Sequence, residues 1–422
     1  MALVVLDAGI ANIALPTIAR AFAVTPGEAV LVTTAYQTAL VMALLPVAAL
    51  GDRLGCRKVF VLGVGLFTAG SVLCAVAPSL PLLFAARFLQ GLGAAAVMAL
   101  GVALLRVTVA DGQLGRAIGW NALTVALAGA SGPAVGALII SHAPWPWLFA
   151  INIPVGVLAL VASTALPTVP PTSQRLDLSS MLLSATVFGA SVTGAELGLS
   201  CPSLTLAALV TAAAALIAVV RREHAKSTPI IPIDLLRLRP FRLSVIASVL
   251  CFTGQAAALV ALPFLLQDEL HQTVLVAGLC MAAWPVSVAA MATISGRLAD
   301  RCSTAWMCTL GATLLATALG AVSLSSLDDH LAILTLLLSA SGVGFSLFNV
   351  PNNKTMFLSA PLRRSAAAGG LQATARLSGQ TLGAVLMTAI FNVTDVDLAP
   401  RTGLMLGAAM VLTAGLVSMR RR

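Results

Sequence analysis

Long apolar segments recur along the whole chain, and they constrain its fold more than any other feature of the sequence. About fourteen of them approach ~20 residues, the length that an α-helix needs to cross a bilayer. The alternating pattern of a membrane β-barrel is absent, so we predict an all-α integral membrane protein. The predicted spans are Ala2–Ala19, Ala29–Leu50, Val59–Ala77, Pro81–Val107, Gly115–Ile140, Trp147–Leu166, Leu178–Leu197, Pro202–Val220, Leu243–Leu266, Val274–Ile294, Thr304–Leu324, Leu331–Asn349, Ala366–Phe391 and Gly403–Val417.

The composition agrees with this class. Of 422 residues, 59% are hydrophobic and 9% are charged, whereas a soluble domain carries about 25% charged residues. A net charge of +9 would suggest nucleic-acid binding in a soluble protein. Here we interpret the excess cations as topological markers on cytoplasmic loops, with no nucleic-acid partner. The scattered cysteines and histidines have no ligand spacing, and no catalytic motif is present. We therefore predict no metal, no cofactor and no enzymatic activity.

The distribution of positive charge predicts the topology. If the basic loop at residues 51–58 is cytoplasmic, alternation of sides places about 20 Lys and Arg residues on that same side, as the positive-inside rule expects. That count depends on an even number of spans. We therefore expect both termini to be cytoplasmic and the protein to lie in the cytoplasmic (inner) membrane.

The basic loop itself separates the second and third apolar segments. Hydrocarbon cannot accept its cationic side chains, so the loop must lie at a membrane surface. Its glycines can adopt positive φ, which would let the flanking helices reverse within a few residues. A weaker copy follows the tenth apolar segment, and the repeat predicts two related halves. The residues of this pattern are Gly51, Asp52, Arg53, Gly55, Arg57 and Lys58 in the first copy and Gly296, Asp300 and Arg301 in the second.

The first apolar segment contains an acid, Asp7, followed by Asn12. An acid within a span is unfavourable unless it faces a cavity or a partner, so Asp7 is a candidate functional residue. A second interpretation stays open, because the chain starts only six residues before Asp7. At ~1.5 Å per residue, the carboxylate would then lie about 10 Å from the chain start and could reach the aqueous interface.

The fourth apolar segment contains a cation, Arg87, and an amide, Gln90. Arg87 could extend outward to the interface, or it could remain inside the span as a functional group. A guanidinium is permanently charged and cannot itself carry a proton. Its functional role would be to influence the protonation of a nearby acid or to hold a water molecule.

Small residues dominate part of the fifth apolar segment. Gly129, Gly132 and Gly136 would let another helix pack closely, and Pro133 would bend the helix. We expect a hinge or a tight helix crossing here. The segment that follows, residues 145–154, contains two tryptophans that we interpret as anchors at the outer interface.

The chain resembles the fourteen-span drug:proton antiporter branch of the major facilitator superfamily in four strings. They are L-D-x-x-x-x-N-x-A-L-P at residues 6–16, R-x-x-Q-G-x-G-A at 87–94, G-x-x-G-P-x-x-G at 129–136 and W-x-W-x-F-x-I-N-x-P at 145–154. The two basic loops are also similar to the loops of this superfamily. The chain departs from the pattern at Ala137, where a glycine is usual, and at Pro146, where an arginine is usual.

The resemblance implies a fold and a domain organisation. The fold would be a major facilitator-type helical bundle with two pseudo-symmetric six-helix halves and two extra central spans. The first half would comprise residues 1–166 and the second half residues 243–422. Residues 167–242 would form a linker with the two extra spans and a cytoplasmic loop. Members of the branch carry more apolar sequence before the first acid, so we expect a longer first span than the one given.

The resemblance also implies a function. That function is proton-coupled efflux of drugs or other small amphipathic molecules by alternating access. The further partners would be protons and the lipid bilayer, and the protein would be a monomer. Asp7 and Arg87 would couple transport to protons, and residues 129–136 would be the antiporter motif. Candidate residues for the substrate cavity are Asn12, Gln90, Gln255, Asn349 and Arg376.

Two alternatives remain open. The protein could export one specific metabolite, because motifs of this kind do not exclude a narrow substrate range. More remotely, it could be a polytopic membrane enzyme or a sensor that transports nothing. The latter should show clustered catalytic groups or an added soluble domain, and the sequence contains neither.

Overall fold

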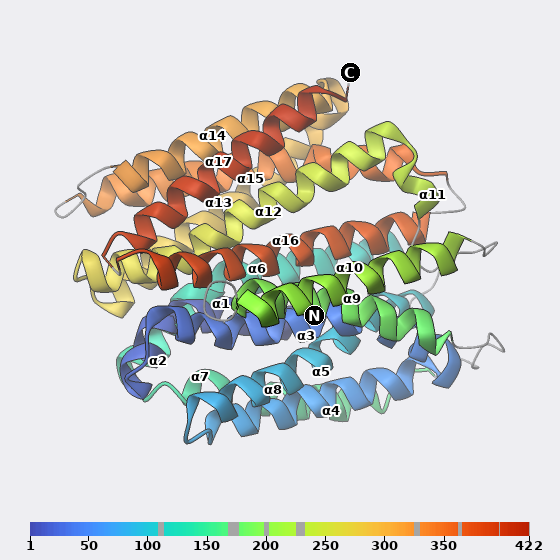
Figure 1. Cartoon of the computed structure of the whole chain (residues 1–422), viewed down its shortest axis with the longest axis horizontal. Helices are drawn as coiled ribbons and strands as arrows, with labels where there is room; N and C mark the ends of the chain where they lie inside the picture. Colours follow the sequence, from blue (N-terminus) through green and yellow to red (C-terminus); the bar gives the residue numbers. More distant parts are fainter. Residues whose placement is uncertain are drawn as a thin grey trace. The chain divides into compact units, whose positions relative to one another are not determined.

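The computed structural model describes residues 1–108, 114–167, 177–197, 202–224, 233–324, 330–361, 365–395 and 397–421. These residues form helices and no strand (Figure 1). They divide into two compact units, unit 1 (Met1–Arg222) and unit 2 (Glu223–Arg422). The predicted divisions at residues 166/167 and 242/243 stay predictions. Most of the predicted linker lies outside the described residues.

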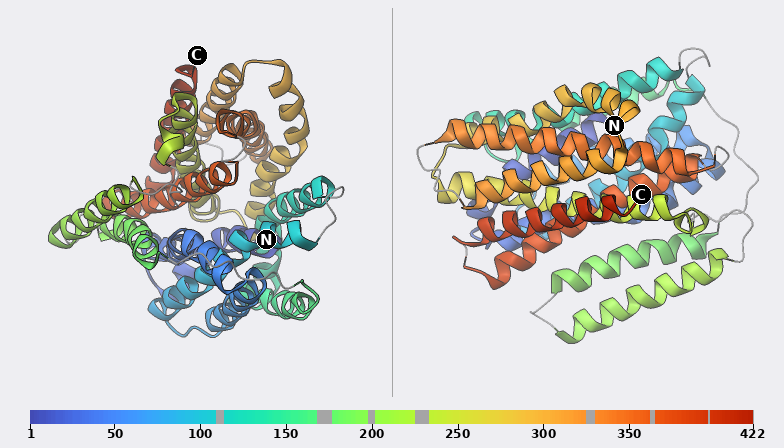
Figure 2. Two further views of the ribbon diagram at one scale, coloured as in Figure 1. Left: turned by 90° about the vertical axis from the view of Figure 1, so that its right-hand side faces the viewer. Right: turned by 90° about the horizontal axis from the view of Figure 1, so that it is seen from above.

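Unit 1 is a bundle of helices in which α5 is central. Helix α5 packs along both α3 and α4, α1 packs along α6, and α4 also contacts α8 (Figure 2). Helix α9 packs against α3. The helices of unit 1 are α1 (Ala2–Ile13), α2 (Leu15–Phe22), α3 (Pro26–Leu54), α4 (Cys56–Ala75), α5 (Leu80–Thr108), α6 (Leu114–His142), α7 (Trp147–Ala150), α8 (Asn152–Ser163), α9 (Leu178–Leu197) and α10 (Pro202–His224).

Unit 2 is a second bundle. Helix α12 packs along α16 and α17, and α15 packs along α13 and α14. The helices of unit 2 are α11 (Ile233–Leu236), α12 (Arg239–Phe264), the π-helical turn η2 (Leu265–Glu269), α13 (Val274–Arg301), α14 (Thr304–Leu324), α15 (Leu331–Ser359), α16 (Ser365–Val393) and α17 (Ala399–Met419).

The prediction of an all-helical chain is confirmed for the described residues, but the number of spans is not. Each predicted span coincides with one or two helices. Nine described helices are long and apolar enough to cross a membrane, or ten if the bent pair α1 and α2 counts as one span. Helix α16 is not among them, because Gln372, Arg376 and Gln380 interrupt its apolar sequence. The fourteen-span count and the pseudo-symmetry therefore stay predictions.

The predicted basic loop is a one-residue turn between α3 and α4. Gly55 has φ 95°, a conformation that favours glycine, and α4 begins at the next residue. Gly51 was expected to take part in the turn, but it lies inside α3. There it allows close contact, because a Cβ atom would collide with the side chain of Leu100. The Nη2 atom of Arg57 donates to the carbonyl oxygen of Thr164 at 2.7 Å. The side chain of Asp52 lies outside the described part of the chain.

The second copy of the pattern is not a loop, which corrects the prediction for Gly296, Asp300 and Arg301. All three residues lie in α13, and the chain turns only after Arg301. Leucine, alanine and arginine between and beside them favour a helix, and no neighbour approaches the position of a Cβ atom at Gly296. Asp300 instead receives an ion pair from Lys354 of α15 at 2.6 Å. In both copies the Asp-Arg pair therefore lies in the last turn of a helix, α3 or α13, and the chain turns directly after it.

Candidate functional site

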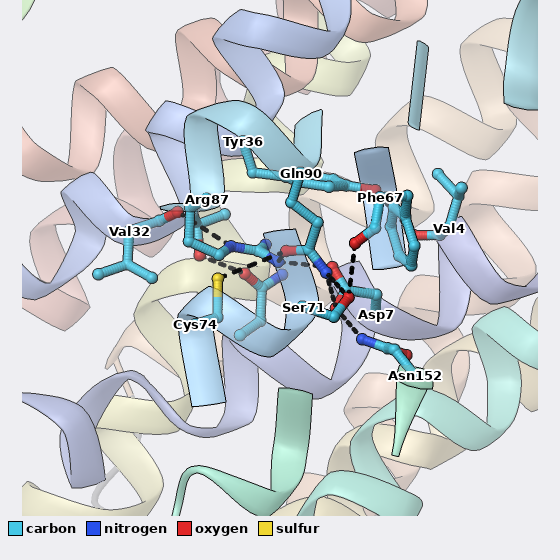
Figure 3. Close-up of polar contacts among 12 residues, drawn as sticks. Val4, Asp7, Val32, Tyr36, Phe67, Ser71, Cys74, Arg87, Gln90 and Asn152 are labelled. Carbon is cyan, nitrogen blue, oxygen red and sulfur yellow. Dashed lines mark hydrogen bonds and ion pairs between the residues drawn. The ribbon is translucent and has the colours of Figure 1, made fainter. Parts of the chain in front are cut away.

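A buried polar cluster lies among the helices of unit 1. Its side chains come from α1, α3, α4, α5 and α8 and point toward one another (Figure 3). The carboxylate of Asp7 is its centre, and Asp7 is 1% exposed. The other members are Tyr36, Ser71, Cys74, Arg87, Gln90 and Asn152.

The carboxylate of Asp7 pairs with the guanidinium of Arg87. The Nη1 atom of Arg87 donates to Oδ2 of Asp7 at 2.6 Å, and Arg87 is 0% exposed. For each residue the sequence left open an interfacial position or a position inside the bundle. The structure shows the second for both Asp7 and Arg87. Each of these two side chains is buried against the other.

Two amides complete the environment of the acid. The Nε2 atom of Gln90 donates to Oδ1 of Asp7 at 3.2 Å and also to the hydroxyl of Ser71 at 2.8 Å. The Nδ2 atom of Asn152 donates to the same Oδ1 at 2.6 Å. Asp7 therefore accepts hydrogen bonds from three side chains, those of Arg87, Gln90 and Asn152.

Two aromatic rings lie against the guanidinium of Arg87. Its Cζ atom lies 4.2 Å from the ring centroid of Tyr36 and 5.4 Å from that of Phe149. A desolvated contact of this kind is worth about 2 kcal/mol. The Nη2 atom is nevertheless buried without a hydrogen-bond partner. The arrangement fixes the position of the arginine while leaving one donor unused.

Glycines bring the backbones of these helices close enough for the cluster to form. A Cβ atom at Gly70 of α4 would lie 2.8 Å from Cα of Gln90. Likewise, a Cβ atom at Gly91 of α5 would collide with the carbonyl oxygen of Tyr36. These two positions therefore require glycine if α5 is to approach α3 and α4 this closely.

The predicted antiporter motif packs directly on the helix that carries Asp7. Gly132 of α6 faces Gly9 of α1, and a Cβ atom at Gly132 would lie 3.0 Å from Cα of Gly9. Gly136 faces Ile10 and Ile13 in the same way, whereas Gly129 has room for a methyl group. Pro133 lies inside α6. The tight helix crossing predicted for this segment is therefore present, and its partner is α1.

The chemistry available to this cluster is a change of charge at the acid. Ionised Asp7 and Arg87 together carry no net charge. If Asp7 binds a proton, the pair gains one positive charge, and Arg87 loses its counter-ion in a site closed to water. Such a change can alter how the surrounding helices pack. The described residues include no group of His, Cys, Asp or Glu that could hold a metal ion.

The other predicted cavity residues lie elsewhere. Asn12 of α1 accepts a hydrogen bond from Thr33 at 3.4 Å and does not join the Asp7 cluster. In unit 2, Oε1 of Gln255 is buried without a partner. Asn349 accepts a hydrogen bond from Asn353 at 3.2 Å. Arg376 of α16 has a buried Nε atom that also has no partner.

A second polar cluster in unit 2 was not predicted. The Nη2 atom of Arg421, two residues beyond α17, donates to Oδ1 of the buried Asn352 at 2.5 Å. Asn352 in turn donates to the hydroxyl of Ser248 at 2.7 Å. Burial lowers the pKa of the Arg421 guanidinium from its ordinary value. This cluster ties the end of α17 to α12 and α15.

Four members of the Asp7 cluster were not predicted: Tyr36, Ser71, Cys74 and Asn152. Asn152 is within the string at residues 145–154, which was interpreted as an interfacial anchor, so a signal was present. Tyr36 and Ser71 carried none beyond the fact that Tyr36 is the only tyrosine of the chain. A hydroxyl in an apolar helix most often bonds to its own backbone, and Ser71 also does so, to Phe67 at 2.8 Å.

Comparison with known proteins finds one family and many relatives. The family model described as Major Facilitator Superfamily matches residues 1–384 and also residues 244–420. The chain is 38% identical to "Uncharacterized transporter YebQ" of Escherichia coli, over 99% of this chain and 92% of that protein. It is 28% identical to "Riboflavin transporter RibZ" of Clostridioides difficile, over 92% of this chain and 85% of that protein.

A further relative is named a multidrug resistance protein. The chain is 30% identical to "Multidrug resistance protein Stp" of Mycobacterium tuberculosis, over 92% of this chain and 73% of that protein. Among solved structures, a POT family transporter in complex with 5-aminolevulinic acid matches with a TM-score of 0.75 and 14% identity. That match covers 99% of this chain and 94% of the other, and it indicates a shared fold.

Proposed function

The chain belongs to the major facilitator superfamily, and from this premise we propose that it is a proton-coupled exporter of drugs or other small amphipathic molecules. Membership of the family makes it a multi-pass membrane transporter and not an enzyme. Proton coupling, the direction of transport and the substrate are the proposal. So are the inner-membrane location, the cytoplasmic termini and a monomeric state.

One observation carries the proposal: a buried carboxylate, Asp7, whose counter-ion is the buried Arg87. Ionisable residues deep in apolar helices are unfavourable and commonly form proton pathways in transporters. Asp7 would bind and release the proton. Arg87 would hold the ionised acid and lose its counter-ion when the acid is protonated.

The packing of α6 on α1 supports a link between the acid and helix movement. Gly132 contacts Gly9, which is two residues from Asp7. A change in the pairing of Asp7 would therefore act on a helix crossing in which the two backbones already pack closely. In alternating access, the two repeats of a transporter rock about a central site, and such a crossing could transmit the change.

The energy of the gradient is sufficient for accumulation. One proton moving through ~100 mV gains about 2.3 kcal/mol. That energy corresponds to about fifty-fold accumulation of substrate before any pH difference is counted.

The test is dye transport into inside-out membrane vesicles that contain the protein. The ethyl ester of rhodamine B serves as a cationic amphipathic probe. We expect uptake that a protonophore abolishes and that falls at least about tenfold in Asp7→Asn. Asp397→Asn, which removes an exposed carboxylate, is the matched control and should transport normally. Uptake that persists with the protonophore, or in Asp7→Asn, would overturn the coupling.

Export of one metabolite is the second candidate, and the similarity to a transporter named for riboflavin favours it. The same vesicles incubated with riboflavin in place of the dye distinguish the two. Gradient-driven uptake of riboflavin without uptake of the dye would favour a narrow substrate range.

A further inference from the structure

Arg376 lies deep in α16 of unit 2. It is eleven residues after Ser365, where the helix begins, and seventeen residues before Val393, where it ends. At ~1.5 Å per residue, its Cα atom is about 17 Å from one end of the helix and about 26 Å from the other. A long side chain can extend toward the interface, but it cannot cover either of these distances.

Among the described residues of unit 2, no carboxylate forms an ion pair with Arg376. Helices α12, α15 and α16 contain no Asp or Glu. The ion pairs of the described acids in this unit join Glu269 to Arg401 and Asp300 to Lys354. The Nε atom of Arg376 is buried and has no hydrogen-bond partner, although the residue as a whole is partly exposed. Within the described part of unit 2, the guanidinium therefore has no counter-ion, and Arg376 as a whole is partly exposed.

The polar groups described next to Arg376 along α16 are neutral amides. Gln372 lies one turn before it and donates to Oδ1 of Asn353 at 3.2 Å. Asn353 continues the chain of amides to Asn349. Near it, α16 packs closely on α12, where a Cβ atom at Gly379 would lie 2.7 Å from both the carbonyl oxygen of Val249 and the Cβ atom of Phe252. Amides and apolar groups can orient a guanidinium, but they do not neutralise it.

An unpaired arginine within a membrane helix bundle is unfavourable unless a ligand supplies the counter-charge. The planar guanidinium fork suits carboxylate, sulfonate and phosphate groups, which it can bind with two parallel hydrogen bonds. We propose that Arg376 binds the acidic group of the transported molecule, so that the substrates include amphipathic organic acids. This inference rests on the proposed transport function and adds the chemical class of the substrate.

Transport of a matched pair of dyes tests the proposal. Rhodamine B carries a free carboxylate, and its ethyl ester is the same dye without that charge. In inside-out vesicles, Arg376→Gln should lower uptake of rhodamine B about tenfold or more, the effect of one lost charge-assisted contact. Uptake of the ester should stay unchanged, and Arg376→Lys should be intermediate for rhodamine B. Arg239→Gln removes an exposed cation of the same unit and should leave both dyes unaffected.

Comparison of the two dyes decides whether Arg376 binds the substrate carboxylate or has a structural role. Equal losses for both dyes in Arg376→Gln would assign Arg376 a structural role and overturn the anion subsite. An unchanged uptake of rhodamine B would also overturn it. If the unaltered protein transports neither dye, the proposed multidrug function is wrong. Whether Arg376 binds an anion is then tested by a measurement that needs no transported substrate.

That measurement places a cysteine at Gln372, one turn from Arg376. Its rate of modification is compared for an anionic and a cationic methanethiosulfonate, with the parent protein as the background. An uncompensated guanidinium should raise the anionic-to-cationic rate ratio about tenfold over the same cysteine in Arg376→Gln. Equal ratios would mean that Arg376 already has a counter-ion, such as a lipid phosphate, and would overturn the proposal.

Discussion

Arg87 in unit 1 and Arg376 in unit 2 are both arginines in the interior of long helices, but their surroundings differ in one respect. Arg87 has a carboxylate, a glutamine and two aromatic rings within contact distance. Arg376 has no acid on its own helix or on the helices α12 and α15. The charge of the first arginine is paired with an acid of the protein, and by our proposal the charge of the second is paired by a ligand. One bundle therefore suits a proton that changes an internal pair, and the other suits a ligand that completes a pair.

The largest effect should come from breaking the internal pair. Arg87→Gln leaves Asp7 buried without its counter-ion, and removal of one partner from a buried pair destabilises a protein by about 3–5 kcal/mol. We expect a clear fall in the melting temperature of the purified protein, whereas Arg376→Gln, which strands no partner, should melt as the parent does. The double variant Asp7→Asn with Arg87→Gln should recover part of the loss. Equal falls in melting temperature for Arg87→Gln and Arg376→Gln would contradict the proposed difference between the surroundings of the two arginines.

A smaller effect should follow from removing one donor to the acid. Asn152→Ala takes away the 2.6 Å hydrogen bond to Oδ1 of Asp7, and a bond to a charged group contributes about 1.5–3 kcal/mol. Thermal unfolding should show this loss. Asn353→Ala is the counterpart near Arg376, where no charge depends on the amide, and should lower stability by less. A larger loss for Asn353→Ala would indicate that the amides near Arg376 have a structural role.

The close packing of α1, the helix that carries Asp7, gives a third test of the difference between the two units. Gly132→Val places a branched side chain against Gly9, and overpacking of this kind destabilises by about 1–3 kcal/mol. We expect gradient-driven uptake of both rhodamine dyes to fall together, since the helix of the proton site moves. Gly129→Ala, on the same face but with room for a methyl group, should keep parental uptake. Loss in Gly129→Ala would show that the whole segment, rather than the crossing at Gly9, is sensitive.

The smallest effect on stability should come from giving Arg376 an internal partner. Gln380→Glu places a carboxylate one turn away on α16, and such helical pairs contribute about 0.2–0.5 kcal/mol. The melting temperature should change little, but uptake of rhodamine B should fall because the new carboxylate competes with that of the dye. Uptake of the ester should persist. Undiminished uptake of rhodamine B would count against Arg376 as its binding group.

Much of the fold could be predicted because apolar length and charge are local properties of the sequence. The helices follow from them, and so does the importance of Asp7, Arg87 and Gln90, which are costly in an apolar segment. What could not be predicted depends on contacts between distant segments. Asn152 lies 145 positions from the acid it binds, and nothing local distinguishes it from an anchor residue.

The glycines illustrate the same limit. Gly51 and Gly55 both permit positive φ, but only Gly55 uses it. Gly51 lies inside α3, where the side chain of Leu100 packs beside it. Gly296 repeats the pattern in sequence and remains helical. Similarly, α16 carries Gln372, Arg376 and Gln380 at intervals of four residues, and it is not among the helices apolar enough to count as membrane spans. A criterion based on hydropathy alone therefore excludes the helix that contains Arg376.

The position of Tyr36 makes the chain its own spectroscopic reporter. It is the only tyrosine among 422 residues, and its ring lies against the guanidinium of Arg87. Protein labelled with ¹³C-tyrosine would give one tyrosine ring signal in a nuclear magnetic resonance spectrum, free of overlap and requiring no substitution. That single resonance would follow the Asp7 cluster while pH, membrane potential or ligand is varied in intact bilayers.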